Sequence, residues 1–456
     1  MDTDTVIERT CRPRFIGVRK KADGYKVMTQ KKRMTSMSHL IRFLCIVILG
    51  FMLASPCFAS DVTYTVKPGD SLAGIASAYL PLAASYTRYE FVEEIKKVNG
   101  LSEKTMSVGQ VITIPVVRNE PVKPVCVKRP KTFEAKGAYA NQFTSSSRQI
   151  LTMGERLKKN GANTVVFDAK EVEGLPTYKS AVPRDVLGID AYYYPIEDLS
   201  KMVDYLHKQG IHVVARICMF RDIRNSSRND QWRFDKEWVD PAEHAVQDYN
   251  LAIIKELITF GVDEIQVDYF RYPADGKTFT GIEGKSRSDV LTEYARRIHE
   301  LTSSKGVLLS LDMFGIVIWQ REQDIKILGQ DVMKFKDHFD IISPMLYPSH
   351  FTKNFSGVAN PADQPYMFIS SGVKRMKALV GEQVVIRPWL QSFPLRVTIG
   401  YNAGYVKAQM KAAQDSGATG WLLWSPGNRY DEAYRAMEDL AAKDPANSVK
   451  TSQASQ

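Results

Sequence analysis

The sequence predicts an α/β protein in which a (β/α)8 barrel follows a small domain of two strands and two helices. Between residues 135 and 442, short β-rich segments alternate eight times with longer segments, many with amphipathic helical periodicity. Such alternation is typical of βα units around a parallel sheet, and eight units in about 300 residues fit a closed barrel. The composition agrees, because 44% of the 456 residues are hydrophobic and 25% are charged, as in globular proteins with more than one domain.

The eight strands of the barrel are predicted from short runs of β-branched and aromatic residues. They cover residues 137–143, 164–169, 212–220, 264–269, 307–314, 341–347, 384–391 and 420–424. Helical periodicity is clear between several of them, at residues 150–159, 199–208, 241–260, 289–302 and 405–414.

The two-residue repeat of a strand predicts which side chains point into the barrel. In the fourth strand, Gln266 and Asp268 share one face, whereas Ile265 and Val267 share the other. The apolar face must meet the helices, so the polar face points inward. The same parity places these residues of the other strands inside: Val166, Asp168, Val214, Arg216, Cys218, Ser310, Asp312, Ser343, Met345, Tyr347, Val385, Arg387, Trp389, Gln391, Leu422 and Trp424.

These inward residues predict a polar pocket at the carboxyl ends of the strands, because a barrel that needed only packing would carry Val, Ile and Leu there. Its charged residues are Asp168, Arg216, Asp268, Asp312 and Arg387, and its flat walls are Tyr347, Trp389 and Trp424. Arg271, His350 and Gln391 are further candidates for contact with a ligand. Aromatic faces stack on sugar rings and carboxylates accept hydrogen bonds from hydroxyls, so the pocket suits a saccharide. The alternative is structural, with Asp268 paired to Arg271 or Arg387 and Asp312 only capping its loop.

Charge and cysteine content argue against several other classes of protein. The net charge is +10, but the first 42 residues hold eleven basic and four acidic side chains and so account for +7. Little positive charge is left for a nucleic-acid surface on the folded part. The histidines show no metal-ligand spacing, no G-x-S-x-G motif occurs, and Cys126 and Cys218 make neither a disulfide framework nor a zinc site. No metal and no cofactor are therefore expected.

The amino-terminal region predicts export. Residues 43–60 are uncharged and largely apolar, follow Arg42, and contain Cys57-Phe58-Ala59 as a small-x-small cleavage site. This order is typical of a secretory signal, here residues 37–60 with cleavage after Ala59, and places the mature protein in the periplasm, cell envelope or extracellular space. The alternative is an uncleaved membrane anchor at residues 43–59. We assign no function to the basic extension at residues 1–36 and expect a disordered tail at residues 443–456.

The small domain, residues 61–117, contains the blocks YTVKPGDSLAGIA, VNGL and VGQVITIP in that order. It resembles a LysM module, which implies binding to N-acetylglucosamine-containing polymers, above all peptidoglycan. The resemblance places the binding groove at Gly69, Asp70, Ser71, Leu72, Asn99, Gly100 and Leu101. Residues 81–89 look like an insertion relative to that family. A proline-rich linker follows at residues 118–134.

The large domain, residues 135–442, contains the blocks VVFDAKEVEG, GVDEIQVDYFRYP, LSLDMFG, ISPMLYPSH, IRPWLQSF and GWLLWSPG. It resembles an uncharacterised bacterial family of glycosyl hydrolase-like domains, which implies a TIM barrel. An α-amylase-like arrangement would map the nucleophile onto Asp268 and the acid onto Asp312, although Gln266 stands where that pattern has Arg. A chitinase-like pattern also resembles DEIQVDYFRYP, but Phe270 or Arg271 occupies the position of its Glu.

Hydrolysis of a glycosidic bond requires two carboxyl groups. We therefore predict an exported glycoside hydrolase acting on a polysaccharide, with Asp268 as nucleophile or base and Asp312 as general acid. Arg216 and Arg387 would orient carboxylates or substrate, and Asp168 would bind hydroxyls. The competing hypothesis is a catalytically inactive glycan-binding envelope protein that kept the groove of the barrel.

Overall fold

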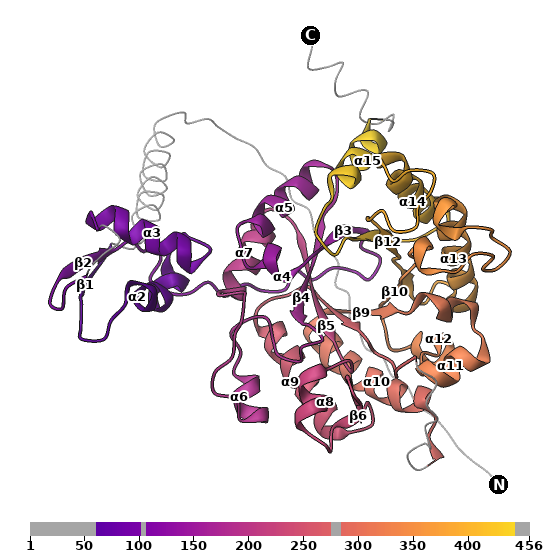
Figure 1. Ribbon diagram of the computed structural model, residues 1–456, viewed down its shortest axis with the longest axis horizontal. Helices are drawn as coiled ribbons and strands as arrows, with labels where there is room; N and C mark the ends of the chain where they lie inside the picture. The colour runs from indigo at the N-terminus through magenta and orange to yellow at the C-terminus, as the bar shows by residue number, and fades with distance from the viewer. Residues whose placement is uncertain (1–60, 102–105, 275–283, 443–456) are drawn as a thin grey trace, which may run out of the picture. The chain divides into compact units, whose positions relative to one another are not determined.

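A computed structural model describes residues 61–101, 106–274 and 284–442 (Figure 1). The predicted basic extension, signal peptide and carboxyl-terminal tail lie outside these residues. Within the three described ranges, no helix combines the length and the apolar composition needed to cross a membrane.

The small domain has the predicted order of strand, helix, helix and strand. It consists of β1 (Val62–Thr65), α2 (Leu72–Tyr79), the 3-10 helix η1 (Leu80–Leu82), α3 (Arg88–Asn99) and β2 (Val111–Ile114). The strands pair antiparallel, with Val62 opposite Ile114. Local sequence sets the helix ends: Ser71 caps α2 by accepting a hydrogen bond from the Gly74 amide, and Gly100, at φ 61°, ends α3.

The large domain is built on one parallel sheet. Its strands are β3 (Ala135–Ala140), β4 (Thr164–Lys170), β5 (His212–Cys218), β8 (Glu264–Asp268), β9 (Leu308–Met313), β10 (Ile341–Pro344), β11 (Val385–Ile386), β12 (Trp389–Gln391) and β13 (Gly420–Trp424). Their order across the sheet is β11-β10-β9-β8-β5-β4-β3-β13-β12. Neighbouring strands follow the chain order of the predicted units, which confirms the barrel topology.

The seventh predicted strand, residues 384–391, is divided into β11 and β12 at Arg387 and Pro388. Proline has no N–H group to donate to the ladder, so the strand is interrupted there. The two pieces still close the ring, because β11 pairs with β10, β12 pairs with β13, and a further parallel bridge joins Met345 to Trp389.

Helices surround the strands on the outside of the barrel (Figure 1). The longer ones are α5 (Gln149–Lys159), α7 (Leu199–Lys208), α9 (His244–Thr259), α10 (Arg287–Lys305), α13 (Pro365–Val380), α14 (Ala403–Asp415) and α15 (Asp431–Ala441). Short elements in the loops are α4 (Gln142–Ser145), α6 (Val182–Leu187), α8 (Ile223–Arg228), β6 (Arg233–Asp235), β7 (Trp238–Val239), η3 (Gly315–Trp319), α11 (Glu322–Leu328), α12 (Val332–Phe335), η4 (Pro348–His350) and η5 (Pro361–Asp363).

The apolar residues of the barrel divide between two cores, as the two-residue repeat predicts. Outward residues such as Ile265 and Val267 join the large core beneath the helices. A smaller cluster is formed by Tyr139, Val166, Val214, Tyr347, Trp389 and Leu422. Five of these six were predicted to point inward. Because most apolar side chains lie in the core beneath the helices, the polar inward residues lie together inside the barrel.

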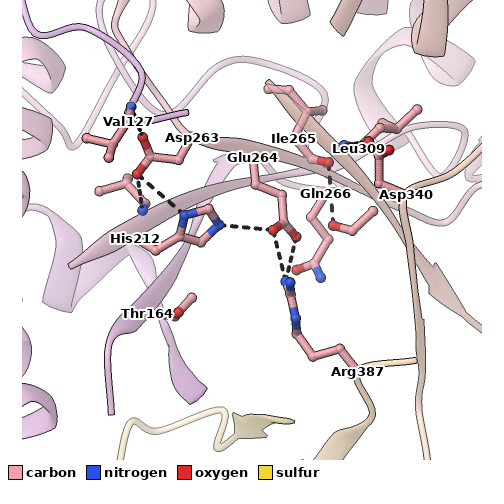
Figure 2. A network of polar contacts seen from close by, with 12 residues as sticks. Val127, Thr164, His212, Asp263, Glu264, Ile265, Gln266, Leu309, Asp340 and Arg387 are labelled. Atoms are coloured by element: carbon pink, nitrogen blue, oxygen red, sulfur yellow. Dashed lines mark hydrogen bonds and ion pairs between the residues drawn. The ribbon is translucent and has the colours of Figure 1, made fainter. Parts of the chain in front are cut away.

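A buried polar network lies at the end of the barrel where the strands begin (Figure 2). Glu264, the first residue of β8, accepts hydrogen bonds from Arg387 Nη1 at 2.9 and 3.0 Å and pairs with His212 Nε2 at 3.0 Å. Burial alone would raise the pKa of Glu264. The Arg387 charge and the His212 hydrogen bond outweigh burial and lower this pKa to about 2. The neighbouring Asp263 accepts a hydrogen bond from the amide of Val127, so the predicted linker contacts the barrel here.

Candidate active site

Three aspartates from different strands surround one arginine inside the barrel. Arg216 of β5 donates through Nη1 to Asp168 of β4, and its Nη2 lies 2.7 Å from Oδ2 of Asp268 on β8. Its Nε lies 3.1 Å from the same Asp268 oxygen and 3.7 Å from Oδ2 of Asp312 on β9. All four side chains are buried. The three acidic side chains therefore meet at one positive charge.

Arg216 lies beside Gln266 on the neighbouring strand. In the parallel pairing of β5 with β8, Arg216 lies opposite Gln266, and Cys218 lies opposite Asp268. A guanidinium group can therefore reach Asp268 from the neighbouring strand. Asp268 pairs with Arg216, and not with Arg271 or Arg387 as in the structural alternative.

Asp268 is held by contacts on both of its oxygens. Oδ2 accepts from Arg216, whereas Oδ1 accepts from the Tyr269 amide at 2.5 Å. Tyr269 has φ 50°, a backbone conformation that favours glycine and costs energy for a tyrosine. Such strain beside a candidate catalytic group is common in active sites. The local backbone thus fixes the carboxylate and turns the chain away from β8.

Asp312 lies in a different electrostatic environment. Its Oδ1 accepts a hydrogen bond from Trp389 Nε1 at 2.6 Å. Burial and the nearby negative charge of Asp268 raise the pKa of Asp312 well above its ordinary value. Asp312 therefore favours the protonated form, and the hydrogen bond at Oδ1 leaves Oδ2 as the oxygen that can carry the proton.

A cavity of 590 Å³ opens over these groups. Its volume is within the range of ordinary ligand sites. Eight of the predicted site residues line it: Arg216, Asp268, Arg271, Asp312, Tyr347, His350, Trp389 and Trp424. They come from six strands or from the loops that follow them, where the active sites of (β/α)8 barrels lie.

Three predicted site residues do not line this cavity. Asp168 lies beneath it, where it accepts hydrogen bonds from Arg216 and Tyr139 and so supports Arg216. Gln391 is buried and fastens a loop by accepting from the Ser349 amide at 3.1 Å. Arg387 is at the opposite end of the barrel, because it precedes Pro388 early in the seventh strand and pairs with Glu264.

Several lining residues were not predicted from the sequence. They are Tyr269, Phe314, Gly315, Ile316, Arg321, Phe351, Thr352 and Phe355. Tyr269 follows Asp268 by one residue, and Phe314 follows Asp312 by two. Their positions next to the strand ends could therefore have indicated that they line the cavity. The others lie on loops whose path no strand parity defines. Tyr139 was also missed, although it shares the inward face of the first strand.

Aromatic rings form much of the cavity wall. The ring of Trp424 stacks on Tyr139 with centroids 4.0 Å apart, and Trp389 meets Trp424 edge to face at 5.7 Å. His350 packs edge to face against Tyr347 at 5.0 Å. Burial, aided by the nearby Arg396 charge, lowers the pKa of His350 and favours its neutral form. These flat surfaces suit the faces of sugar rings.

In the small domain, most predicted groove residues also have structural roles. The Asp70 carboxylate accepts hydrogen bonds from the Lys67 amide at 2.7 Å and from the Tyr64 hydroxyl at 2.8 Å. The Asn99 side chain donates to the Ile95 and Thr113 carbonyls. Leu72 and Leu101 pack partly against the core, and Gly69, at φ 85°, makes the turn. A glycan would therefore meet mainly backbone groups and the exposed parts of these residues.

The described residues contain no group of three or more His, Cys, Asp or Glu side chains arranged to hold a metal ion. Cys126 and Cys218 are free thiols.

A (β/α)8 barrel with two carboxyl groups and aromatic walls at the carboxyl ends of its strands has the architecture of a glycoside hydrolase. The chain belongs to the family described as "Putative glycosyl hydrolase domain", which matches residues 138–430. It also carries a LysM domain, matched at residues 64–115, and such a module indicates association with the cell envelope and with a carbohydrate polymer.

Individual proteins are similar to parts of the chain. The cell division suppressor protein YneA of Geobacillus thermodenitrificans is 32% identical over 99 residues, which cover 21% of this chain and 97% of YneA. Among solved structures, the PgaB (BpsB) glycoside hydrolase domain from Bordetella bronchiseptica is 12% identical, with a TM-score of 0.49, and covers 70% of this chain and 99% of that domain. The Bacillus cereus spore cortex-lytic enzyme SleL is 13% identical, with a TM-score of 0.43, and covers 82% of this chain and 85% of SleL.

Proposed function

We propose that this protein is an exported, envelope-associated glycoside hydrolase that cleaves glycosidic bonds of a polysaccharide in the barrel cavity. The LysM domain would hold the protein on peptidoglycan or another N-acetylglucosamine-containing polymer. One observation carries the enzymatic proposal: Asp268, ion-paired to Arg216, and Asp312, with its raised pKa, line the same cavity. Two carboxyl groups in different protonation states are what an acid and a nucleophile require.

Asp312 would act as the general acid. Burial and the Asp268 charge raise its pKa well above the ordinary value and so favour its protonated form. The hydrogen bond from Trp389 fixes Oδ1, so Oδ2 would donate the proton to the leaving oxygen of the glycosidic bond.

Asp268 would act as the nucleophile or base. Its ion pair with Arg216 and the hydrogen bond from the Tyr269 amide fix the orientation of the carboxylate. When the bond to the leaving group breaks, positive charge develops on the sugar ring, and a carboxylate beside the ring stabilises it. Trp389, Trp424 and Tyr347 would hold the ring by stacking.

The test is release of reducing ends by the purified protein from peptidoglycan and from a panel of α-glucans, β-glucans and hexosamine polymers. Asp268→Asn and Asp312→Asn should each lower the rate by at least about 100-fold. Asp204→Asn is the matched control, because Asp204 lies on α7 in a surface pair with Lys208. The control should keep the wild-type rate.

The second candidate is a glycan-binding protein without catalysis. One observation favours it: two nitrogens of Arg216 donate to Oδ2 of Asp268. These hydrogen bonds would have to weaken before this oxygen could attack a sugar. This candidate predicts that the protein and its Asp268→Asn variant bind a glycan equally well, and that no polymer in the panel gains reducing ends. Release of oligosaccharides by the wild type alone would exclude it.

A further inference from the structure

Arg271 lies in the cavity three residues after Asp268, on the loop that follows β8. Aromatic rings surround its guanidinium group, whose central carbon is 4.8 Å from the ring centroids of Trp238 and Phe314 and 5.6 Å from that of Tyr269. These contacts hold the planar group in place through cation–π attraction. The side chain is partly buried and is therefore a fixed part of the wall.

Arg271 forms no ion pair or hydrogen bond with a carboxylate among the described residues, although the charge of Asp268 acts on it from nearby. Its Nη1 donates to the Tyr272 carbonyl at 3.0 Å. Other arginines near the cavity have acidic partners: Arg216 has the aspartates, Arg221 has Glu237 at 2.8 Å, and Arg321 has Asp324 at 2.7 Å. Burial lowers the pKa of Arg271 from its ordinary value, which reflects the cost of a positive charge removed from water. An anion at this position would offset that cost.

The charges of the wall also favour an anionic ligand. The lining side chains include three guanidinium groups, on Arg216, Arg271 and Arg321, against the two carboxyl groups of Asp268 and Asp312. Asp312 favours its neutral form and Asp268 is already paired with Arg216. A negatively charged sugar can therefore approach the catalytic pair without meeting an uncompensated carboxylate.

We propose that Arg271 binds the carboxylate of a hexuronic acid unit, so that the substrate is an acidic polysaccharide. This inference rests on the proposed function, because it assigns the substrate class of the same cavity. A guanidinium group presents parallel N–H donors that match the two oxygens of a carboxylate, and its single charge equals that of a uronate. The short chain distance to Asp268 places this contact beside the bond to be cleaved.

The experiment is a binding titration of the purified full-length protein with oligosaccharides of polygalacturonate, alginate and hyaluronate. Each is compared with its carboxyl-reduced, neutral form. At least one carboxylated oligosaccharide should bind about 10- to 100-fold more tightly than its reduced form, as expected for a charge-assisted pair of hydrogen bonds. Arg271→Gln should abolish this preference while the affinity for the reduced form is kept.

Arg156→Gln is the matched control. Arg156 also stacks on a tyrosine, with its guanidinium 4.0 Å from the Tyr434 centroid, and pairs with Asp431, but it does not line the cavity. This variant should keep the preference. A glycerol-phosphate polymer is added as a separate arm, and tighter binding of that polymer than of every uronate would overturn the assignment of a carboxylate.

Equal affinity for the carboxylated and reduced forms of all three polymers would overturn the inference, as would a preference that survives in Arg271→Gln. Assays for reducing ends separate this failure from that of the proposed function. Cleavage of neutral polymers without any preference for uronates would retain the hydrolase and reject the anion site. A preference that requires Arg271, with no cleavage of any polymer, would retain the anion site and reject the hydrolase.

Discussion

Asp268 and Asp312 approach the same nitrogen atom: Nε of Arg216 is 3.1 Å from Oδ2 of Asp268 and 3.7 Å from Oδ2 of Asp312. One guanidinium group therefore fixes the spacing of the candidate catalytic pair. The separation of the two oxygens can be no larger than the combined length of these contacts. The two oxygens are therefore no further apart than the short end of the spacing found in enzymes that admit a water molecule between their carboxyl groups.

This spacing predicts hydrolysis with retention of anomeric configuration. Retaining enzymes hold their carboxyl groups about 5 to 5.5 Å apart, whereas inverting enzymes need about 6.5 to 9.5 Å. Proton NMR of the first product, recorded before mutarotation, should show the same anomeric configuration as the cleaved bond of the substrate. Initial formation of the opposite anomer would contradict the prediction, because Asp268 would then act on water and not on the sugar.

The raised pKa of Asp312 predicts the alkaline limb of the pH profile. A general acid works only while protonated, so activity should fall as the pH rises through the pKa of Asp312 in the folded protein, and this fall should lie above the pH at which an ordinary aspartate titrates. The measurement is kcat/KM against pH on a substrate found in the panel. In Asp312→Asn the residual activity should lose this limb.

Glu171→Gln is the control for this assignment. Burial and the Asp168 charge raise the pKa of Glu171 to about 7, so loss of the Glu171 proton is a second potential source of an alkaline limb. Glu171 does not line the cavity. The alkaline limb should therefore persist in Glu171→Gln, and its disappearance would mean that Asp312 is not the acid.

The sequence predicted the barrel and the convergence of its acidic residues because both depend on local periodicity. Alternation along β8 was enough to place Asp268 inside, and the same rule applied to β5 and β9 brought Arg216 and Asp312 to the same site. Strand parity defines the face on which a side chain lies, but it defines poorly how far along the barrel axis the side chain sits.

This limit explains Arg387. The inward direction of Arg387 was predicted, but its position along the barrel axis was predicted wrongly. Pro388 interrupts the strand, and Arg387 lies near the start of the strand beside Glu264. Loops set a second limit. Arg321 and Phe351 reach the cavity from segments after β9 and β10 whose course depends on tertiary packing. Neither side chain had a periodic pattern from which its position could be inferred.

Removal of the Arg216 charge should impair both stability and activity. Asp168, Asp268 and Asp312 are buried around this guanidinium group, so Arg216→Met leaves carboxylates without a partner. Breaking a buried ion pair in this way costs about 3–5 kcal/mol. Urea denaturation should show this loss in the free energy of unfolding. Arg216→Lys keeps the charge but not the planar donor fork, so it should recover much of the stability while the activity stays low.

Equal activity of Arg216→Lys and the wild type would contradict a positioning role for the guanidinium group. A charge near Asp268 would then be sufficient, and the geometry of its two nitrogens would not matter.

The pair of Glu264 and Arg387 predicts acid sensitivity that is independent of the active site. The pKa of Glu264 in the folded protein is lowered to about 2, whereas a glutamate in the unfolded chain has its ordinary pKa of 4.5. A lowered pKa stabilises the fold above the unfolded value, and this stability is lost as the pH falls from about 4.5 towards 2. At 1.36 kcal/mol per pKa unit the loss is roughly 3 kcal/mol. Urea unfolding at pH 7, 4 and 2.5 measures it.

In Glu264→Gln the free energy of unfolding should be lower at pH 7, and its decrease towards pH 2.5 should be smaller than in the wild type. The double variant Glu264→Leu, Arg387→Met removes both charges and should be more stable at pH 7 than either single variant, because each single variant leaves one member of this buried pair without its partner. His212 loses Glu264 as a partner in the double variant and in Glu264→Leu but keeps it in Arg387→Met, so Glu264→Leu is the comparison in which His212 is matched. Destabilisation in the double variant equal to the sum of the two single effects would show that the pair contributes no coupling, and that Arg387 is held at this end of the barrel by packing alone.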